Sequence, residues 1–262
     1  MANVTNTDPG LGPWVSTGGN AQLRPYEANQ FDASYEYYFA PDGFISVSGF
    51  YKDLKNWNIA ATTVRDFTQF YIPGYHQAVS SDGTTIYTPA TFQGLNTTYT
   101  GGLTGTVKGV ELQASVPLGR LTKVLDGFGV IGAAAFTDGK LDNGSDVPGL
   151  SKRVYKVTGY FEKWGFSARA SLNKRSAYLS EDRGGSNTIT PVNRAGETLV
   201  DAQIGYDFKN TGVKYLEGLR LSIQGTNLTN QKDIYTDTAS GLTTRAETFG
   251  RNFMFNATYS FF

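Results

Sequence analysis

The most constraining feature of this sequence is a two-residue alternation of apolar and polar side chains, which residues 251–262 (RNFMFNATYSFF) show most clearly. Successive side chains of a strand point to opposite faces, so the alternation predicts a strand with one apolar and one polar face. An aromatic-rich strand at a chain end suits a lipid-facing barrel better than a soluble domain, whose frayed end would expose it. The predicted apolar face carries Phe253, Phe255, Ala257, Tyr259 and Phe261, and Phe262 follows.

The same alternation recurs in eight earlier segments, and turn formers such as Ala40-Pro41-Asp42-Gly43 separate them. No stretch longer than one or two turns has the period of a helix. We therefore predict an all-β, antiparallel meander of about nine strands. The eight earlier strands are expected at about residues 30–39, 44–52, 104–116, 127–137, 152–161, 166–174, 200–208 and 219–224.

The links between these strands alternate between short and long. Short links follow the first, third, fifth and seventh strands, and long polar links follow the second, fourth, sixth and eighth. An outer-membrane barrel has short periplasmic turns at one end and long external loops at the other, whereas a soluble sandwich has no reason to sort its links. The pattern favours a transmembrane β-barrel whose carboxyl end is periplasmic. The long links are about residues 53–102, 138–149, 176–196 and 230–247.

Composition is compatible with such a barrel and excludes several other classes of protein. The mean hydropathy is −0.32, which a barrel reaches because half of each strand faces a polar lumen. The 23 basic and 23 acidic residues cancel, so no net charge attracts nucleic acid. Without cysteine there is no disulfide or thiolate site. His76 is the only histidine, and it lies in a polar link without a nucleophile-elbow pattern, so we expect neither an enzyme nor a cofactor.

Two short motifs resemble known binding sites but lack the context that such sites require. Residues 127–132 match G-x-G-x-x-G, yet no strand precedes them and no helix follows, so we predict a strand of small residues. The link at 138–149 offers carboxylate and amide oxygens without the spacing of a calcium loop, and no metal site is predicted.

Five segments, in order along the chain, resemble the carboxyl-terminal barrel region of TonB-dependent outer-membrane receptors. The first, GGNAQLRPYEANQFDASYEYYF, is similar to the family's Gly-Asn-x-x-Leu-Arg/Lys-Pro-Glu segment, except that Tyr26 here precedes Glu27. The last resembles the family's terminal strand, with Phe262 as an extra residue. The three others are GFISVSGFYKDLKNWN at 43–58, VKGVELQASV at 107–116 and LSIQGTNLTNQKDIY at 221–235.

This resemblance implies a fold, a location and an activity. It implies part of a barrel of about 22 strands, with residues 1–29 as an extracellular loop, residues 30–262 as barrel strands, and the plug domain absent from this chain. It implies a multi-pass β-barrel in the outer membrane of a Gram-negative bacterium. The complete receptor would take up a scarce nutrient, a carbohydrate or an iron chelate. Outer-membrane lipid, the small-molecule nutrient and the TonB complex, acting through the plug, would be its partners. The RPYEANQFD and FYKDL segments look most like receptors of carbohydrate-scavenging proteobacteria.

Substrate contacts, on the family's architecture, would come from the long links and the upper lumen. Aromatic platforms beside charged partners suit a polar small molecule, although each such residue could instead serve loop packing. Two other functions stay open: a small passive porin or adhesin barrel, and a secreted carbohydrate-binding β-sandwich. The candidate contacts are Trp57, Tyr71, Tyr75, Tyr87, Tyr99, Tyr178, Asp182, Arg183 and Arg245.

Overall fold

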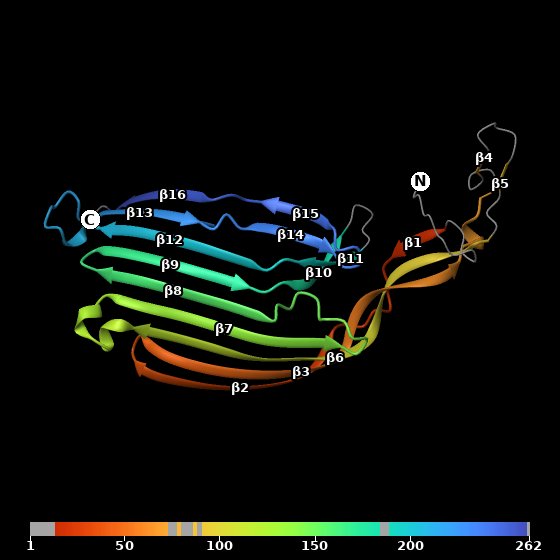
Figure 1. The fold of residues 1–262 in the computed structure, drawn as a ribbon, viewed down its shortest axis with the longest axis horizontal. Helices are drawn as coiled ribbons and strands as arrows, with labels where there is room; N and C mark the ends of the chain where they lie inside the picture. The colour runs from red at the N-terminus through yellow and green to blue at the C-terminus, as the bar shows by residue number, and fades with distance from the viewer. Residues whose placement is uncertain (1–13, 73–77, 80–85, 88–90, 184–188, 261–262) are drawn as a thin grey trace. The chain divides into compact units, whose positions relative to one another are not determined.

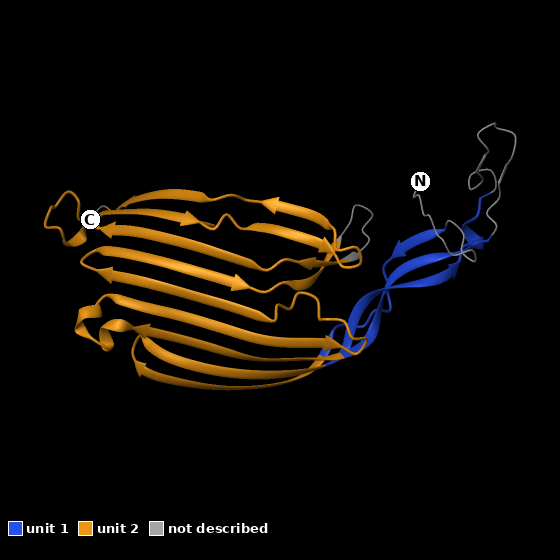
Figure 2. Cartoon of the chain, viewed as in Figure 1, with its two compact units in different colours: residues 1–27, 54–104, 183–189 blue, residues 28–53, 105–182, 190–262 orange. Residues whose placement is uncertain are grey.

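A computed structural model describes residues 14–72, 78–79, 86–87, 91–183 and 189–260 (Figure 1). The chain divides into two compact units (Figure 2). Unit 1 comprises Met1–Glu27, Leu54–Thr104 and Arg183–Ile189, and unit 2 comprises Ala28–Asp53, Gly105–Asp182 and Thr190–Phe262. Among the residues described, no helix has the length and apolar character needed to cross a membrane.

All nine predicted strands are present, and they form one sheet in the predicted order. Each strand lies beside its neighbour in sequence order, from β2 at one edge to β16 at the other, and the pairs from β6 to β16 are antiparallel. The meander prediction is therefore confirmed. Its strands are β2 (Glu27–Ala40), β3 (Gly43–Asp66), β6 (Gln93–Pro117), β7 (Phe128–Leu141), β8 (Arg153–Lys163), β9 (Phe166–Arg175), β12 (Glu197–Asp207), β13 (Leu219–Thr226) and β16 (Asn252–Tyr259).

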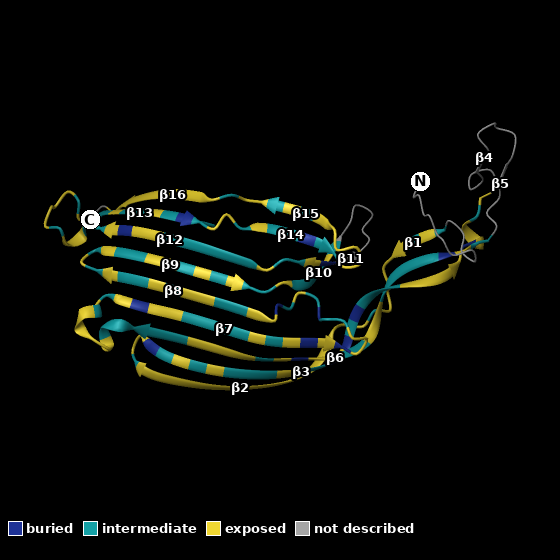
Figure 3. Cartoon of the chain, in the orientation of Figure 1, coloured by how far each residue is buried: buried dark blue, intermediate teal, exposed yellow. Residues whose placement is uncertain are grey.

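The register of the strands separates an apolar face from a polar face. Ile223 of β13 lies opposite Ile204 and Phe255, whereas the next residue, Gln224, lies opposite Gln203 and Met254. The residues that the structure describes do not cover the apolar face, because Ile223 is 57% exposed and Phe255 63% exposed. A soluble sandwich would bury such a face against a second sheet. In Figure 3 the main sheet accordingly shows long exposed and intermediate runs.

The predicted terminal strand is correct where the structure describes it. Phe253, Phe255 and Tyr259 share the apolar face of β16, since they lie opposite Gly225, Ile223 and Leu219. Phe261 and Phe262 lie outside the described residues.

The prediction that residues 53–102 form one polar link is wrong at both ends. β3 continues to Asp66 and β6 begins at Gln93, because backbone pairing continues where the alternation of side chains ends. In unit 1, β1 (Val15–Gly18) pairs with β6 in parallel. The remaining elements of this region are η1 (Thr68–Phe70), β4 (Ala78–Val79) and β5 (Ile86–Tyr87), and β4 pairs with β5.

The links at 176–196 and 230–247, also predicted as loops, instead form a second sheet. Its order is β10 (Tyr178–Arg183), β11 (Ile189–Arg194), β14 (Lys232–Asp237) and β15 (Thr243–Thr248). These strands have few apolar positions, so hydrophobic periodicity did not reveal them. Two of the short links contain 3-10 turns: η2 (Leu118–Arg120) and η3 (Lys123–Leu125) lie between β6 and β7, and η4 (Phe208–Asn210) lies between β12 and β13.

The small-residue segment at 127–132 forms part of β7, as predicted, and its glycines permit close approach. Gly129 lies opposite Tyr160 of β8 on the polar face, and the phenol ring packs over it. A β-carbon on Gly129 would lie 2.1 Å from Cζ of that ring. The glycine is therefore required by packing and not by a phosphate ligand.

Candidate functional site

Four side chains form a row across the second sheet of unit 2. Arg194 of β11 lies directly opposite Tyr235 of β14, and Tyr235 lies directly opposite Arg245 of β15. Tyr178 of β10 joins the row through its hydroxyl, 2.7 Å from Arg194 Nη1. Arg175, the last residue of β9, lies beyond Tyr178. We call these five residues the arginine–tyrosine row.

Guanidinium groups and phenol rings alternate along this row. The Cζ atom of Arg175 lies 4.0 Å from the centroid of the Tyr178 ring, and that of Arg245 lies 3.9 Å from the centroid of the Tyr235 ring. Arg194 lies between the rings, at 5.8 Å from Tyr178 and 5.6 Å from Tyr235. Each tyrosine therefore already has a cation on its ring, an arrangement that stabilises both partners.

Carboxylates hold the arginines in place. Arg194 donates two parallel hydrogen bonds to Asp233, both of 2.7 Å, and the Tyr235 hydroxyl donates to the same carboxylate at 3.0 Å. The hydrogen bond to Asp233 raises the pKa of Arg194 above its already high value, so the guanidinium is always charged. Glu197 adds weaker contacts, 3.7 Å to Arg194 and 3.9 Å to Arg175.

The accessible end of the row is the pair formed by Arg245 and Asp182. Arg245 Nη1 lies 3.4 Å from Asp182 Oδ1, and its Nε lies 3.5 Å from Glu247 Oε1. The Arg245 side chain is 40% exposed, whereas that of Asp233 is only 13% exposed. The row thus has a rigid inner part around Arg194 and an outer end that offers both hydrogen-bond donors and acceptors to a ligand.

The structure brings together three of the nine predicted contact residues: Tyr178, Asp182 and Arg245. It also contains four that sequence reasoning missed, Arg175, Arg194, Asp233 and Tyr235. The signal that could have found them is the polar alternation Asp233-x-Tyr235, which marks one face of a strand.

Two other candidates are packed within unit 1. Trp57 lies against Tyr26, with ring centroids 4.8 Å apart. Tyr71 lies 5.1 Å from Phe92 and 6.5 Å from Trp14, in an aromatic cluster.

Four candidates remain, and the structure describes the side chain of one of them, Tyr99. The carbonyl of Tyr99 accepts a hydrogen bond from Asn20. Tyr75 lies outside the described residues, as do the side chains of Tyr87 and Arg183.

A pair of buried asparagines in unit 1 was also not predicted from the sequence. Asn56 and Asn58, 2% and 6% exposed, lie on β3. Asn56 Nδ2 donates to the carbonyl of Pro25 at 2.6 Å, and Asn58 Nδ2 donates to that of Arg24 at 2.8 Å. The amide of Gly102 donates to Asn56 Oδ1. These asparagines fix the Leu-Arg-Pro segment that precedes β2.

Comparison with known proteins now assigns the family. Residues 2–228 match the family described as TonB dependent receptor-like, beta-barrel. The chain belongs to this TonB-dependent receptor family. The resemblance inferred from the sequence is therefore confirmed. Its members are outer-membrane receptors and transporters, not enzymes.

Individual relatives agree with this assignment. The chain is 26% identical over 235 residues to hemoglobin-binding protein A of Haemophilus influenzae, covering 85% of this chain and 21% of that protein. The siderophore receptor PirA from Acinetobacter baumannii has a similar fold, with a TM-score of 0.59 at 14% identity, over 94% of this chain and 33% of PirA. The pyoverdine outer membrane receptor FpvA from Pseudomonas aeruginosa PAO1, bound to pyoverdine, gives a TM-score of 0.56 at 15% identity, over 91% and 30% of the two chains. The chain thus spans about a third or less of the length of these relatives.

Proposed function

We propose that this chain is the carboxyl-terminal barrel portion of an outer-membrane receptor that takes up an iron chelate. Residues 1–29 would form an external loop and residues 30–262 barrel strands, and the plug would lie outside this chain. The TonB complex would drive uptake through that plug. The family match over residues 2–228 carries this proposal.

The two-faced sheet supports a location in the outer membrane. Ile204, Ile223 and Phe255 are 57%, 57% and 63% exposed in one cross-strand row. Removing one such side chain from water stabilises by roughly 1.5–3 kcal/mol, so a whole face of them strongly favours contact with lipid. The opposite face carries polar residues such as Gln203 and Gln224, which suit an aqueous lumen.

The choice of iron chelate over carbohydrate rests on two observations. Named relatives include a pyoverdine receptor, a siderophore receptor and a ferric citrate transporter. A sugar ring would stack on an aromatic face, but each tyrosine of the row already has two arginines near its ring. They lie at 4.0 and 5.8 Å from the Tyr178 centroid, and at 3.9 and 5.6 Å from the Tyr235 centroid. Charged donors at the outer end of the row suit the anionic oxygens of a chelate.

Within the proposal, the nine candidate contacts have unequal support. Tyr178, Asp182 and Arg245 are favoured, because they belong to one cluster with an accessible end. Trp57, Tyr71, Tyr75, Tyr87, Tyr99 and Arg183 are proposed with less support, as parts of the external links.

The test is uptake by cells that carry the complete gene. We expect accumulation of a radiolabelled ferric siderophore or ferric citrate that requires functional TonB and falls several-fold in Arg245→Ala. Arg220→Ala is the matched control, because its side chain is 70% exposed on the polar face of β13 and does not belong to the row. Uptake that continues without TonB would favour a passive porin instead. Uptake of labelled oligosaccharides alone would overturn the iron-chelate assignment.

A further inference from the structure

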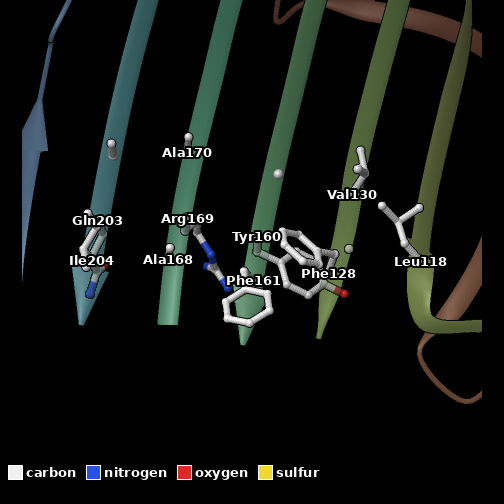
Figure 4. A pocket seen from close by; sticks show the side chains of 13 residues that line it. Leu118, Phe128, Val130, Tyr160, Phe161, Ala168, Arg169, Ala170, Gln203 and Ile204 are labelled. Atoms are coloured by element: carbon white, nitrogen blue, oxygen red, sulfur yellow. The ribbon is translucent and has the colours of Figure 1, made fainter. Parts of the chain in front are cut away.

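A groove lies on the apolar face of unit 2 (Figure 4). Its volume is about 500 Å³. Its floor follows the register, in which Gly159 lies opposite Ala170 and Ala170 lies opposite Ala202. Three small residues in line across β8, β9 and β12 leave a depression about one side chain deep. We call this depression the apolar groove.

Larger apolar side chains form the walls of the groove. Phe128 and Phe161 lie opposite each other at one side, with ring centroids 4.5 Å apart, and Ile204 stands at the other. Figure 4 shows the Phe161 ring near Ala168, with Ala170 further along the same strand. The neighbouring side chains leave the apolar groove open, and a straight hydrocarbon chain could fill it with close van der Waals contacts.

Beyond the Phe161 wall, outside the lining of the groove, lies a pair of opposite charges: Lys163 at the end of β8 and Asp126 in the link before β7. Lys163 follows Phe161 by two residues on the same face of β8, and its Nζ lies 2.9 Å from Asp126 Oδ2. Both members of the pair are accessible, with side chains that are 28% and 64% exposed. A cation and an anion side by side complement a head group that carries both a phosphate and an ammonium.

Trp164 lies beside Lys163, at the turn between β8 and β9. Its ring is 74% exposed, lies 4.4 Å from Lys163 Nζ and meets Phe161 edge-on at 6.4 Å. Its φ is 53° and that of Gly165 is 81°, positions of a tight hairpin turn where Asn-Gly is the usual pair. A tryptophan is poorly suited to that backbone but well suited to the boundary between lipid tails and water. Its presence indicates a role for the ring itself.

We propose that this groove binds one zwitterionic phospholipid with an ammonium head group, such as phosphatidylethanolamine. An acyl chain would lie over Gly159, Ala170 and Ala202, the phosphate beside Lys163, and the ammonium beside Asp126. The inference rests on the proposed function, because it requires the apolar face to be surrounded by lipid. The groove is continuous with that face, which commits its occupant to a membrane lipid. An anionic lipid would add a negative charge to the Lys163–Asp126 pair with no ammonium to offset it, and a trimethylammonium group could not donate a hydrogen bond to Asp126.

The experiment is native mass spectrometry of the complete receptor in detergent. Phosphatidylethanolamine, phosphatidylcholine and phosphatidylglycerol with identical acyl chains would be titrated in turn. We expect one phosphatidylethanolamine to be retained at concentrations about tenfold lower than the other two lipids. Ala170→Leu, which fills the groove, should abolish this difference. Ala114→Leu is the matched control, since it makes the same change on the same face, beside Gly132 and outside the groove.

Further variants separate head group from acyl chain. Asp126→Asn should remove the preference for phosphatidylethanolamine over phosphatidylcholine while leaving one lipid bound. Equal retention of all three lipids by the unmodified receptor, or no effect of Ala170→Leu, would overturn the proposal. Iron-chelate uptake measured on the same variants keeps the two proposals distinct. Loss of lipid selectivity with normal TonB-dependent uptake refutes only the lipid site, whereas selective lipid binding without any uptake refutes only the proposed transport.

Discussion

Replacing Asp233 by alanine tests whether the arginine–tyrosine row holds the second sheet together. Asp233 accepts two hydrogen bonds of 2.7 Å from Arg194, and its side chain is 13% exposed. Hydrogen bonds to charged groups contribute about 1.5 kcal/mol each, so the lost pair is worth about 3 kcal/mol. Glu197, 3.7 Å from Arg194, can recover part of this. We expect Asp233→Ala to destabilise the second sheet by about 2 kcal/mol, or about 30-fold in its opening equilibrium.

Hydrogen exchange of the complete receptor measures this opening directly. Amides of β11 and β14 should exchange about 30-fold faster in Asp233→Ala, while those of β8 and β9 keep their rates, because the substitution does not touch the main sheet. Arg220→Ala removes an arginine that is 70% exposed and should change exchange by no more than about twofold.

A double-mutant cycle with Arg194→Ala decides between a specific pair and general loosening. If the two side chains stabilise the sheet through each other, the double variant should be little worse than either single variant. Additive losses would contradict this account, as would an increase in exchange below about threefold in Asp233→Ala alone. Either result would mean that backbone pairing, and not the charged row, holds the four strands.

Three further predictions concern other parts of the chain. Gly129→Val should destabilise the barrel by about 1–2 kcal/mol because the ring of Tyr160 must leave its place over the strand, whereas Gly132→Ala, with nothing within 4 Å of its new β-carbon, should be tolerated; urea unfolding midpoints compare the two. Asn56→Ala should cost about 1 kcal/mol, since it removes the buried side chain that pairs with the amide of Gly102 and the carbonyl of Pro25, and faster exchange of the Gly102 amide would report it. Lys140 contacts Asp146 at 2.6 Å, and the hydrogen bond it donates holds the pKa of that carboxyl below its ordinary value of 3.8. The resulting stability of the 142–152 link should be complete above that ordinary value and lost as pH falls through the lower folded pKa. Proteolysis of the link at pH 3 and pH 6 should show this difference, and Lys140→Met should reduce it, because Lys152, 3.5 Å from the same carboxylate oxygen, remains.

The main sheet could be predicted because the alternation that defines each of its strands lies within a short stretch of sequence. In β9, Phe166, Ala168 and Ala170 alternate with polar residues, and any strand that separates lipid from water must do the same. The order of the nine strands could also be predicted from their connections. A short link cannot reach any strand except the next one, and the longer loops return the chain to the same edge of the sheet.

The second sheet and the row it carries could not be predicted in the same way. β14 reads Lys-Asp-Ile-Tyr-Thr-Asp, in which no apolar period appears, and β11 contains Pro191. Their pairing depends on Arg194 meeting Asp233 and Tyr235, residues about 40 positions apart, and such a contact has no local signature. Tyr178, Asp182 and Arg245 were predicted because each aromatic or charged residue in a long link is by itself a candidate for ligand contact. Arg194, which lies between the two tyrosine rings, was not predicted.

In unit 2 the apolar face of the main sheet is exposed, whereas a soluble β protein would bury it. The main sheet and the second sheet therefore depend on different interactions for their stability. The apolar face of the main sheet is exposed, while Leu141, Val147, Val192 and Tyr235 are among the most buried side chains described, and all four lie in or beside the long links. The main sheet must therefore draw its stability from surroundings that cover Ile223 and its neighbours. The second sheet carries its own small core together with the arginine–tyrosine row. Detergent or lipid exchange should consequently change the unfolding of the main sheet far more than the local opening of β11 and β14, because only the first depends on what covers the apolar face.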